Sequence, residues 1–376
     1  MRIAFDIRKL GDYGIGTYIR NLLLQFSALD HQNFFYLIAH SGQPQEFKSL
    51  PPNFSFILDP TAGNWFWNDL VLPRLLQKYG VELLHTPHYR CPRFLKCCSV
   101  ITMHDCVHIL FPNIAGSKAE SRRSRKRTQR SVSSCSHIIT VSEATRRDVE
   151  RLFQVPSKKI TVIHNAIDER MTVRNKKVEE KKTLERYQVD GPFLLYAGNI
   201  RPHKNIVRVI EAFAVLKSEV QTDQTWHRLK LFIIGDELSK YQLLRRTVIR
   251  GGIQNDVRFL GFVPYETLRV FYRSAQIFVF PSLYEGFGLP PLEAMANGTP
   301  VLTSNVSSLP EVLGEAALLV NPENVFEISK GLKHLLFDLS LRNDLREKGF
   351  QQVKKYSWRK SAKLSLKTYE RVLGRK

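Results

Sequence analysis

Short apolar runs alternate with segments of helical periodicity along most of this chain, and no other feature constrains its fold as much. The first half opens with the apolar run Ile3–Ile7, and apolar side chains then recur at helix spacing from Ile19 to Phe26. Strands that alternate with helices form a mostly parallel sheet that helices cover on both faces. We therefore predict an α/β fold. The other strands expected in this half are Phe34–Ala39, Val81–His85, Val100–Met103, His137–Val141 and Ile160–Ile163.

One helix start in this half is predicted from a single residue. Ser142 follows the strand that ends at Val141, and a helical segment runs from Glu143 to Phe153. A serine in that place accepts a hydrogen bond from a backbone N–H group that has no partner inside the helix. We therefore expect Ser142 to be the N-cap.

A second series of the same kind fills the other half of the chain. Its expected strands are Phe193–Ala197, Leu229–Ile234, Val257–Leu260, Ile277–Phe280, Val301–Thr303 and Ala317–Val320. Its expected helices are Lys204–Lys217, Tyr241–Arg250, Pro291–Asn297 and Val325–Phe337. Between the two series, residues 171–186 are highly charged and nearly devoid of large apolar groups, as in a linker or an exposed helical segment. We predict doubly wound domains at 1–170 and 188–356, a linker over 171–187, and ligands in the cleft at the carboxyl ends of the strands.

The net charge of the chain is +21, and its isoelectric point is near 9.8. Such a surplus favours an anionic partner, which is a nucleic acid, an acidic lipid or a phosphorylated substrate. Residues 118–130 and 354–376 together contribute +14 of this charge. They fit either solvated helix faces or a surface for an anionic membrane or a pyrophosphate-linked lipid acceptor. Nucleic acid is less favoured, because aromatic residues are not interleaved with the charge and no nucleic-acid-binding motif occurs.

The remaining composition is that of an ordinary globular protein. Hydrophobic residues make up 43% of the 376 residues, which excludes a mostly disordered chain. No window approaches about 18 consecutive apolar residues, and the first ten residues read as a buried strand rather than a signal peptide. Without an export signal, the five cysteines are expected to be free thiols in a reducing cytosol.

The segment Tyr284–Gly298 has the residue types of a ligand-binding loop followed by a helix. Its glycines permit a tight turn, and Pro291 suits the first turn of a helix whose start directs N–H groups at an anion such as a diphosphate. Glu285 is expected in the loop and Glu293 on the helix, so that both carboxylates can accept hydrogen bonds from one polyhydroxylated ligand. On the pattern alone, an interpretation of equal weight is that Glu285 is an ordinary turn residue and Glu293 a solvated residue of the helix.

Three other positions have a chemical and a structural interpretation. Lys204 offers a compact charge suited to a phosphate, or it is a solvated lysine at a helix start. His104 ends an apolar strand, where an imidazole can bind a hydroxyl and relay a proton, although a lone histidine is more often structural. Gly14–Thr17 is an incomplete phosphate-binding loop or a simple strand-to-helix turn. The spacing of His85, His88, His104 and His108 fits no standard zinc pattern, so no metal is assigned.

The spacing Glu285-x7-Glu293 within EGFGLPPLEAMANGTPV resembles the signature of the retaining glycosyltransferases of family 4, which have the GT-B fold. The resemblance covers nearly the whole chain and is greatest to the mannosyltransferase B-like branch. It includes a last helix that crosses back onto the first domain, here expected over 357–376. The other motifs that carry it are, in order, DIRKLGDYGIGTYIRNLL, ITMHD, VSEATRRD, VIHNAID, YAGNIRPHKN and VRFLGFVP.

The resemblance implies roles for individual residues. Glu285 would hold the sugar hydroxyls and Glu293 the ribose, while His104 would lie near the donor sugar and the acceptor hydroxyl. Asn199 stands where the family usually has an arginine, and Arg201 is expected to serve in its place. The catalytic residues are thus expected to be His104, Glu285 and Lys204, and the nucleotide sugar to be bound by Gly14, Gly16, Arg201, Lys204, Val263, Gly288, Leu289 and Glu293. His85 and His88 flank Pro87 in a loop similar to an acceptor-side loop of the family.

These implications together give a hypothesis for function. The chain would transfer a hexose, with mannose favoured, from a nucleotide diphosphate sugar to a glycan or lipid-linked acceptor, with retention and without a metal or cofactor. Its expected place is the cytoplasm, at the inner face of the plasma membrane, in the synthesis of a cell-surface polysaccharide. Two alternatives are a nucleotide-sugar epimerase of similar two-domain shape and, from another class, a nucleic-acid-binding protein that uses the basic surface.

Overall fold

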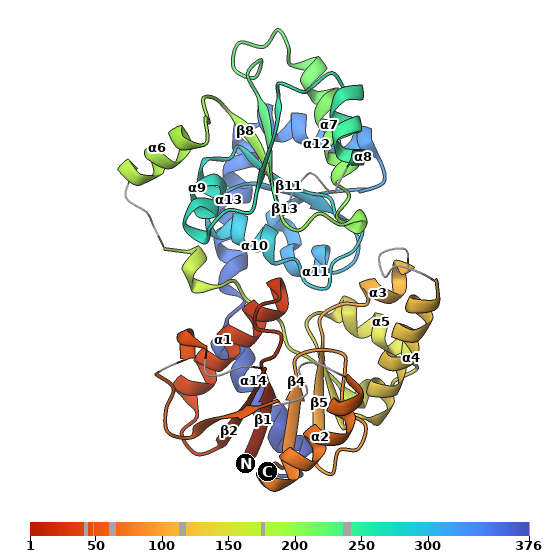
Figure 1. Ribbon diagram of the computed structural model, residues 1–376. Coiled ribbons are helices and arrows are strands. Elements are labelled where there is room, and N and C mark those ends of the chain that lie inside the picture. Colours follow the sequence, from red (N-terminus) through yellow and green to blue (C-terminus); the bar gives the residue numbers. More distant parts are fainter. Residues whose placement is uncertain are drawn as a thin grey trace. The chain divides into compact units, whose positions relative to one another are not determined.

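A computed structural model describes residues 1–40, 44–47, 49–59, 65–112, 118–173, 177–235 and 242–375 (Figure 1). The chain folds into two compact units. Unit 1 comprises Met1–Ala166 and Ser357–Lys376, and unit 2 comprises Ile167–Tyr356. Each unit is built on its own parallel sheet, which confirms the prediction of two Rossmann-like domains.

The sheet of unit 1 has the strand order β3-β2-β1-β4-β5-β6-β7, with every pair parallel. The strands are β1 (Arg2–Asp6), β2 (Phe34–Ala39), β3 (Phe54–Leu58), β4 (Leu83–Thr86), β5 (Cys98–Met103), β6 (His137–Thr140) and β7 (Ile160–Val162). The helices of unit 1 are α1 (Tyr13–Leu29), α2 (Trp65–Lys78), α3 (Val107–Leu110), α4 (Lys118–Ser134), α5 (Glu143–Phe153) and α14 (Trp358–Val372).

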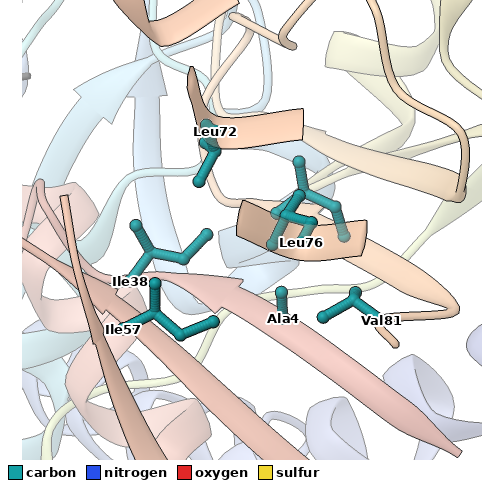
Figure 2. Close-up of a cluster of buried hydrophobic side chains, with 7 residues drawn as sticks. Ala4, Ile38, Ile57, Leu72, Leu76 and Val81 are labelled. Carbon is teal, nitrogen blue, oxygen red and sulfur yellow. The ribbon is translucent and has the colours of Figure 1, made fainter. Parts of the chain in front are cut away.

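The core of unit 1 forms where apolar helix faces cover these strands. Ala4, Ile38 and Ile57 come from three adjacent strands and pack against Leu72 and Leu76 of α2 (Figure 2). All are 2% exposed or less, so this face of the sheet is closed to water. Burial on both faces explains why these strands are continuous apolar runs in the sequence.

Helix α5 begins as the sequence predicts. The Ser142 Oγ accepts a hydrogen bond from the N–H of Thr145 at 3.0 Å. The apolar face that follows buries Val149 and Phe153. The N-cap assignment of Ser142 is confirmed.

Helix α14 returns the end of the chain to unit 1. It packs along α1, and Figure 1 shows it in blue among the red and orange elements of unit 1. Ser361 donates a hydrogen bond to the carbonyl of His164 at 2.6 Å, and Arg371 donates one to the Thr161 Oγ1 at 2.6 Å. Trp358 and Tyr369 are buried, so the helix is part of the core of this unit.

The sheet of unit 2 repeats this topology with six parallel strands in the order β10-β9-β8-β11-β12-β13. The strands are β8 (Phe193–Ala197), β9 (Lys230–Ile234), β10 (Val257–Gly261), β11 (Ile277–Phe280), β12 (Val301–Ser304) and β13 (Ala317–Val320). The helices are α6 (Lys177–Arg186), α7 (Ile206–Glu219), α8 (Gln242–Arg250), α9 (Tyr265–Ser274), α10 (Leu289–Ala296), α11 (Leu309–Leu313), α12 (Val325–Phe337) and α13 (Leu339–Lys354).

The charged segment expected as a linker over 171–187 is grouped with unit 2 in the structure. Most of it forms α6, whose Glu180 makes an ion pair with Arg273 of α9 at 2.9 Å. The Tyr187 ring, just after α6, packs edge-on to Phe271 with centroids 5.4 Å apart. These contacts are polar or aromatic, which is why the segment lacks the aliphatic pattern of a core helix.

Two further features bear on the sequence predictions. All five cysteines are free thiols. Among the described helices, none combines the length and the apolar character needed to cross a bilayer.

Candidate functional site

Both sheets have a topological switch point, where successive connections leave in opposite directions. In unit 2 it lies between β8 and β11, and in unit 1 between β1 and β4. Ligands of doubly wound sheets bind at the carboxyl ends of the strands beside such a point. In unit 2 the residues that follow β8 and β11 include Lys204 and Glu285.

Lys204 and Glu285 lie together at the switch point of unit 2. The Lys204 Nζ is 2.5 Å from the Glu285 Oε1, and the side chains are 13% and 10% exposed. The same Nζ lies 5.3 Å from the centroid of the Phe280 ring, at the end of β11. The pair is 81 residues apart in sequence, and a strongly basic group is thus held beside a carboxylate in a largely desolvated place. Such a pair can bind a phosphate at one end and hydroxyl groups at the other.

The loop that carries Glu285 is held on both sides. The Glu285 N–H donates a hydrogen bond to the Ser307 Oγ at 3.1 Å, and the Glu285 carbonyl accepts hydrogen bonds from the Ser307 and Ser308 hydroxyls at 2.6 and 3.0 Å. The loop after β8 is tied to it by the Leu283 N–H, which donates to the carbonyl of His203 at 2.8 Å. Neither serine was among the residues expected from the sequence, because only the pairing of β11 with β12 places them there.

The start of α10 offers fewer N–H groups than the sequence analysis assumed. The helix begins at Leu289 rather than at Pro291, and the next two positions are Pro290 and Pro291, which have no N–H. Leu289 therefore supplies the only amide among the first three helical residues. Gly288 precedes it with a φ of 99°, and a Cβ there would lie 2.7 Å from a methyl of Leu309, so glycine is required.

Glu293 lies one turn into α10 and faces Tyr272 of α9. The Tyr272 hydroxyl donates to the Glu293 Oε2 at 3.0 Å. The pKa of the Glu293 carboxyl is raised to about 7, chiefly by burial; the hydrogen bond from Tyr272 acts in the opposite direction, and the nearby Asp168 adds to the rise. Near neutral pH this carboxyl is therefore poised between its charged and neutral forms.

In the part of the chain that the structure describes, the side chains of Arg201 and Val263 make no hydrogen bond or ion pair with Lys204 or Glu285. Arg201 is exposed at the start of a 3-10 turn over Pro202–Lys204, and its guanidinium bonds to no residue in the described ranges. Val263 is buried between β10 and α9. Both follow the carboxyl ends of strands of unit 2, as the sequence predicts for ligand-binding positions.

In unit 1, the glycine pair opens α1 instead of forming a loop. The Gly16 N–H donates to the Asp12 carbonyl at 2.7 Å, so it is already used inside the helix. A Cβ on Gly16 would lie 2.2 Å from the Leu10 carbonyl oxygen, which makes this position a packing requirement. Gly14 lies in the uncapped first turn, since the Asp12 side chain makes no cap hydrogen bond. Gly14 and Gly16 thus both lie in the first turn of α1, and their role in binding the nucleotide sugar stays a prediction.

His104 directly follows β5 and is held by two contacts. Its Nε2 lies 3.3 Å from the Pro87 carbonyl, so this nitrogen carries the proton and Nδ1 has the lone pair. The Tyr18 ring packs edge-on at 4.8 Å between centroids. Burial lowers the pKa of His104 to about 4, so the imidazole is neutral at physiological pH and can accept a hydrogen bond.

Behind His104 runs a buried chain of hydrogen bonds. The His85 Nδ1 pairs with the Tyr369 hydroxyl of α14, and its Nε2 pairs with the Thr102 Oγ1 at 2.8 Å. The Tyr18 hydroxyl pairs with the same Thr102 oxygen at 3.0 Å. Burial lowers the pKa of His85 to about 3, so it is a neutral connector of four elements rather than a ligand.

Two rings of the loop after β4 stack with a histidine of α3. His88 stacks on Tyr89 with centroids 4.1 Å apart, and Tyr89 stacks on His108 at 4.2 Å. Burial lowers the pKa of His88 to about 3 and that of His108 to about 4. Across the described ranges, no three side chains of His, Cys, Asp or Glu gather where they could hold a metal ion.

Comparison with known proteins places this geometry in a family. Residues 13–170 match the model described as Glycosyltransferase Family 4, and residues 177–352 match that of Glycosyl transferases group 1. The chain is 34% identical over 296 residues to O-antigen chain mannosyltransferase B of Escherichia coli, covering 78% of this chain and 76% of that protein.

Two solved structures share the fold over nearly their whole length. Sucrose-phosphate synthase from Thermosynechococcus elongatus has a TM-score of 0.79 at 19% identity, covering 100% of this chain and 99% of that one. Anabaena Alr3699/HepE, solved in complex with UDP-glucose, has a TM-score of 0.75 at 16% identity, covering 98% and 99%. At these identities they establish the architecture alone.

Proposed function

The chain belongs to glycosyltransferase family 4 and has the GT-B fold, and from this we propose that it transfers a hexose, with mannose favoured, from a nucleotide diphosphate sugar. The acceptor is a hydroxyl of a glycan or lipid-linked glycan, in the synthesis of a cell-surface polysaccharide. The observation that carries the proposal is the Lys204–Glu285 pair at the switch point of unit 2. The relative from Escherichia coli, an O-antigen chain mannosyltransferase, supports the choice of mannose.

The chemical difficulty of this reaction is the negative charge that develops on the leaving diphosphate. Lys204 and the amide of Leu289 are the groups of unit 2 that would stabilise it, and Arg201 is an exposed cation that follows the same strand. Because Lys204 is paired with Glu285, a bound diphosphate replaces a carboxylate as the partner of Lys204. Glu285 is then released to accept hydrogen bonds from the sugar hydroxyls.

The remaining roles follow from position and charge. Glu293 accepts hydrogen bonds from the ribose hydroxyls, and unit 1 binds the acceptor with His104, whose neutral imidazole accepts a hydrogen bond from the attacking hydroxyl. We assign no residue as a covalent nucleophile and propose attack on the face from which the diphosphate leaves, which gives retention. The proposal requires neither a metal nor a cofactor besides the donor.

A screen of nucleotide sugars by thermal unfolding tests the donor. A ligand that binds only the folded state at about 100 times its Kd adds roughly 2.7 kcal/mol of stability, which raises Tm by roughly 5–10 °C for a domain of this size. We expect GDP-mannose to give such a rise and glucose-1-phosphate none. Product analysis then follows with donor alone and with donor plus a mannosylated lipid acceptor, in the presence of EDTA. A changed sugar with donor alone would instead identify an epimerase, and an inverted product would exclude retention.

The exposed basic residues of α4 lead us to propose also that the protein binds to an anionic membrane. Arg122, Arg123, Arg125 and Lys126 are all exposed on this helix of unit 1. An anionic leaflet attracts such residues by about 1 kcal/mol each, decaying within a Debye length of roughly 8–10 Å. Lipid-linked acceptors lie in that leaflet, so the helix would concentrate enzyme and acceptor on one surface.

We expect the protein to float with vesicles that contain acidic lipid and to be released at high salt. Changing the four residues of α4 to Gln should reduce vesicle binding at least tenfold and leave donor binding unchanged. The control changes four exposed cations of unit 2 to Gln, namely Lys182, Arg245, Arg246 and Lys330. Equal flotation with neutral and acidic vesicles at low salt would show that the charge is only a solvated face.

A further inference from the structure

Tyr272 contacts the carboxylate that the proposed function assigns to the ribose. Its side chain is fully buried in α9, and its ring packs against Phe278 of β11 with centroids 5.3 Å apart. The Thr299 hydroxyl donates to the backbone carbonyl of Tyr272 and fixes the residue from the other side. The phenol oxygen therefore has a defined position, 3.0 Å from the Glu293 Oε2.

The surroundings of Glu293 otherwise disfavour its charge. Asp168 is close enough to raise the pKa of Glu293, and Asp168 is itself held by Arg170 through bonds of 2.9 and 2.6 Å. The other ionisable groups near Tyr272 are the phenols of Tyr196 and Tyr265. In the described ranges no Lys, Arg or His makes an ion pair with Glu293, and the Tyr272 hydroxyl is the side-chain donor that reaches it.

A ribose needs the charged form of this group. Both of its free hydroxyls are donors, and a carboxylate accepts them more strongly than a neutral carboxyl does. A phenol donates one hydrogen bond to one oxygen, so the bond to Oε2 leaves Oε1 to accept from the ligand. The same bond fixes the rotation of the carboxylate plane.

We propose that Tyr272 is a positioning residue for the nucleotide: its hydroxyl holds the Glu293 carboxylate charged and oriented toward the ribose. The inference rests on the proposed function, since it assigns to Tyr272 the support of the ribose contact. Tyr272 itself touches no substrate. Its effect is expected in the pH dependence of nucleotide binding and in the KM for the donor, with kcat at saturating donor nearly unchanged.

The test compares wild type with Tyr272→Phe, which keeps the packed ring and removes only the hydroxyl. Loss of one hydrogen bond to a carboxylate raises the pKa of that carboxylate by about one unit. The affinity for GDP, measured by calorimetry from pH 6 to pH 9, should fall as pH falls through the pKa of Glu293. In Tyr272→Phe the midpoint of this fall should lie about one pH unit higher, which amounts to about fivefold weaker binding at pH 7.

Two control variants separate this effect from a general loss of structure. Tyr356→Phe removes the hydroxyl of a partly buried tyrosine of unit 2, which donates to the Val312 carbonyl at 2.9 Å, and it should leave the midpoint unchanged. Glu293→Gln should bind GDP weakly and without the titration. An equal midpoint in wild type and Tyr272→Phe would overturn the inference.

A measurement without ligand distinguishes failure of the inference from failure of the proposed function. The Glu293 carboxyl carbon, followed by NMR in the free protein, should titrate at a higher pH in Tyr272→Phe than in wild type. If it does so but neither GDP nor UDP binds at any pH, the ribose assignment and the proposed donor are wrong. If the carboxyl titrates at the same pH in both proteins, Tyr272 does not support its charge.

Discussion

Lys204→Ala is expected to lower kcat/KM at least about 100-fold, because one contact to the charge developing on a leaving group is worth several kcal/mol. The loss should lie mainly in kcat, since the diphosphate carries its largest charge in the transition state. Steady-state assays with the donor identified by thermal unfolding measure it. A folded Lys204→Ala variant with near-normal turnover would remove Lys204 from the active site.

The Lys204–Glu285 ion pair complicates this experiment and also supplies its control. Removing one partner of a mostly buried pair leaves the other charge unpaired, which costs up to about 3–5 kcal/mol of stability. The double variant Lys204→Met with Glu285→Gln removes both charges and should regain stability without regaining turnover. Lys217, paired with Asp256 at 2.7 Å and 10% exposed, is a matched position outside the site. Lys217→Met should lose stability and keep its kcat/KM.

Substitutions of Glu293 and Glu285 are expected to affect different steps, namely nucleotide binding and sugar transfer. Glu293→Ala should weaken binding of the bare nucleoside diphosphate by about 10- to 100-fold, the worth of a charged hydrogen bond. Glu285→Ala should leave that binding unchanged or tighter, because it frees Lys204 for the diphosphate. The same variant should lower sugar transfer by about 100-fold or more. Calorimetry with GDP and then with the nucleotide sugar separates the two roles, and equal losses of GDP binding in both variants would contradict them.

Much of the fold could be predicted because parallel strands buried on both faces are continuous apolar runs. Phe193–Ala197, Ile277–Phe280 and Ala317–Val320 were predicted with the bounds that the structure gives them. The elements that were not expected include the strand β3 and the helices α9, α11 and α13. In α9 the buried positions include Arg269 and Tyr272, whose polar groups hide the apolar face from a reading of hydropathy.

The candidate site was predictable only in part, for a different reason. Glu285, Lys204 and His104 could be named because each follows a strand, but their partners depend on strand order. The adjacency of β8 and β11 is what brings Lys204 to Glu285, and no local pattern specifies it. Likewise, Tyr272 supports Glu293 from a helix whose sequence carries no signal for that contact. Gly16 was expected to bind the nucleotide sugar, but no sequence pattern shows that the Leu10 carbonyl leaves no room for a side chain at this position.

The position of α14 has a consequence for the order in which this protein is built on the ribosome. Residues 357–376 complete unit 1, but the 190 residues of unit 2 are translated before them. At about 5–20 residues per second, that interval lasts roughly 10–40 s. During it the Tyr369 partner of His85 does not yet exist, and the face of α1 that α14 covers is open. Unit 2 is continuous in sequence and can fold within the interval, so the nascent chain is exposed to premature association through unit 1 until its last helix emerges.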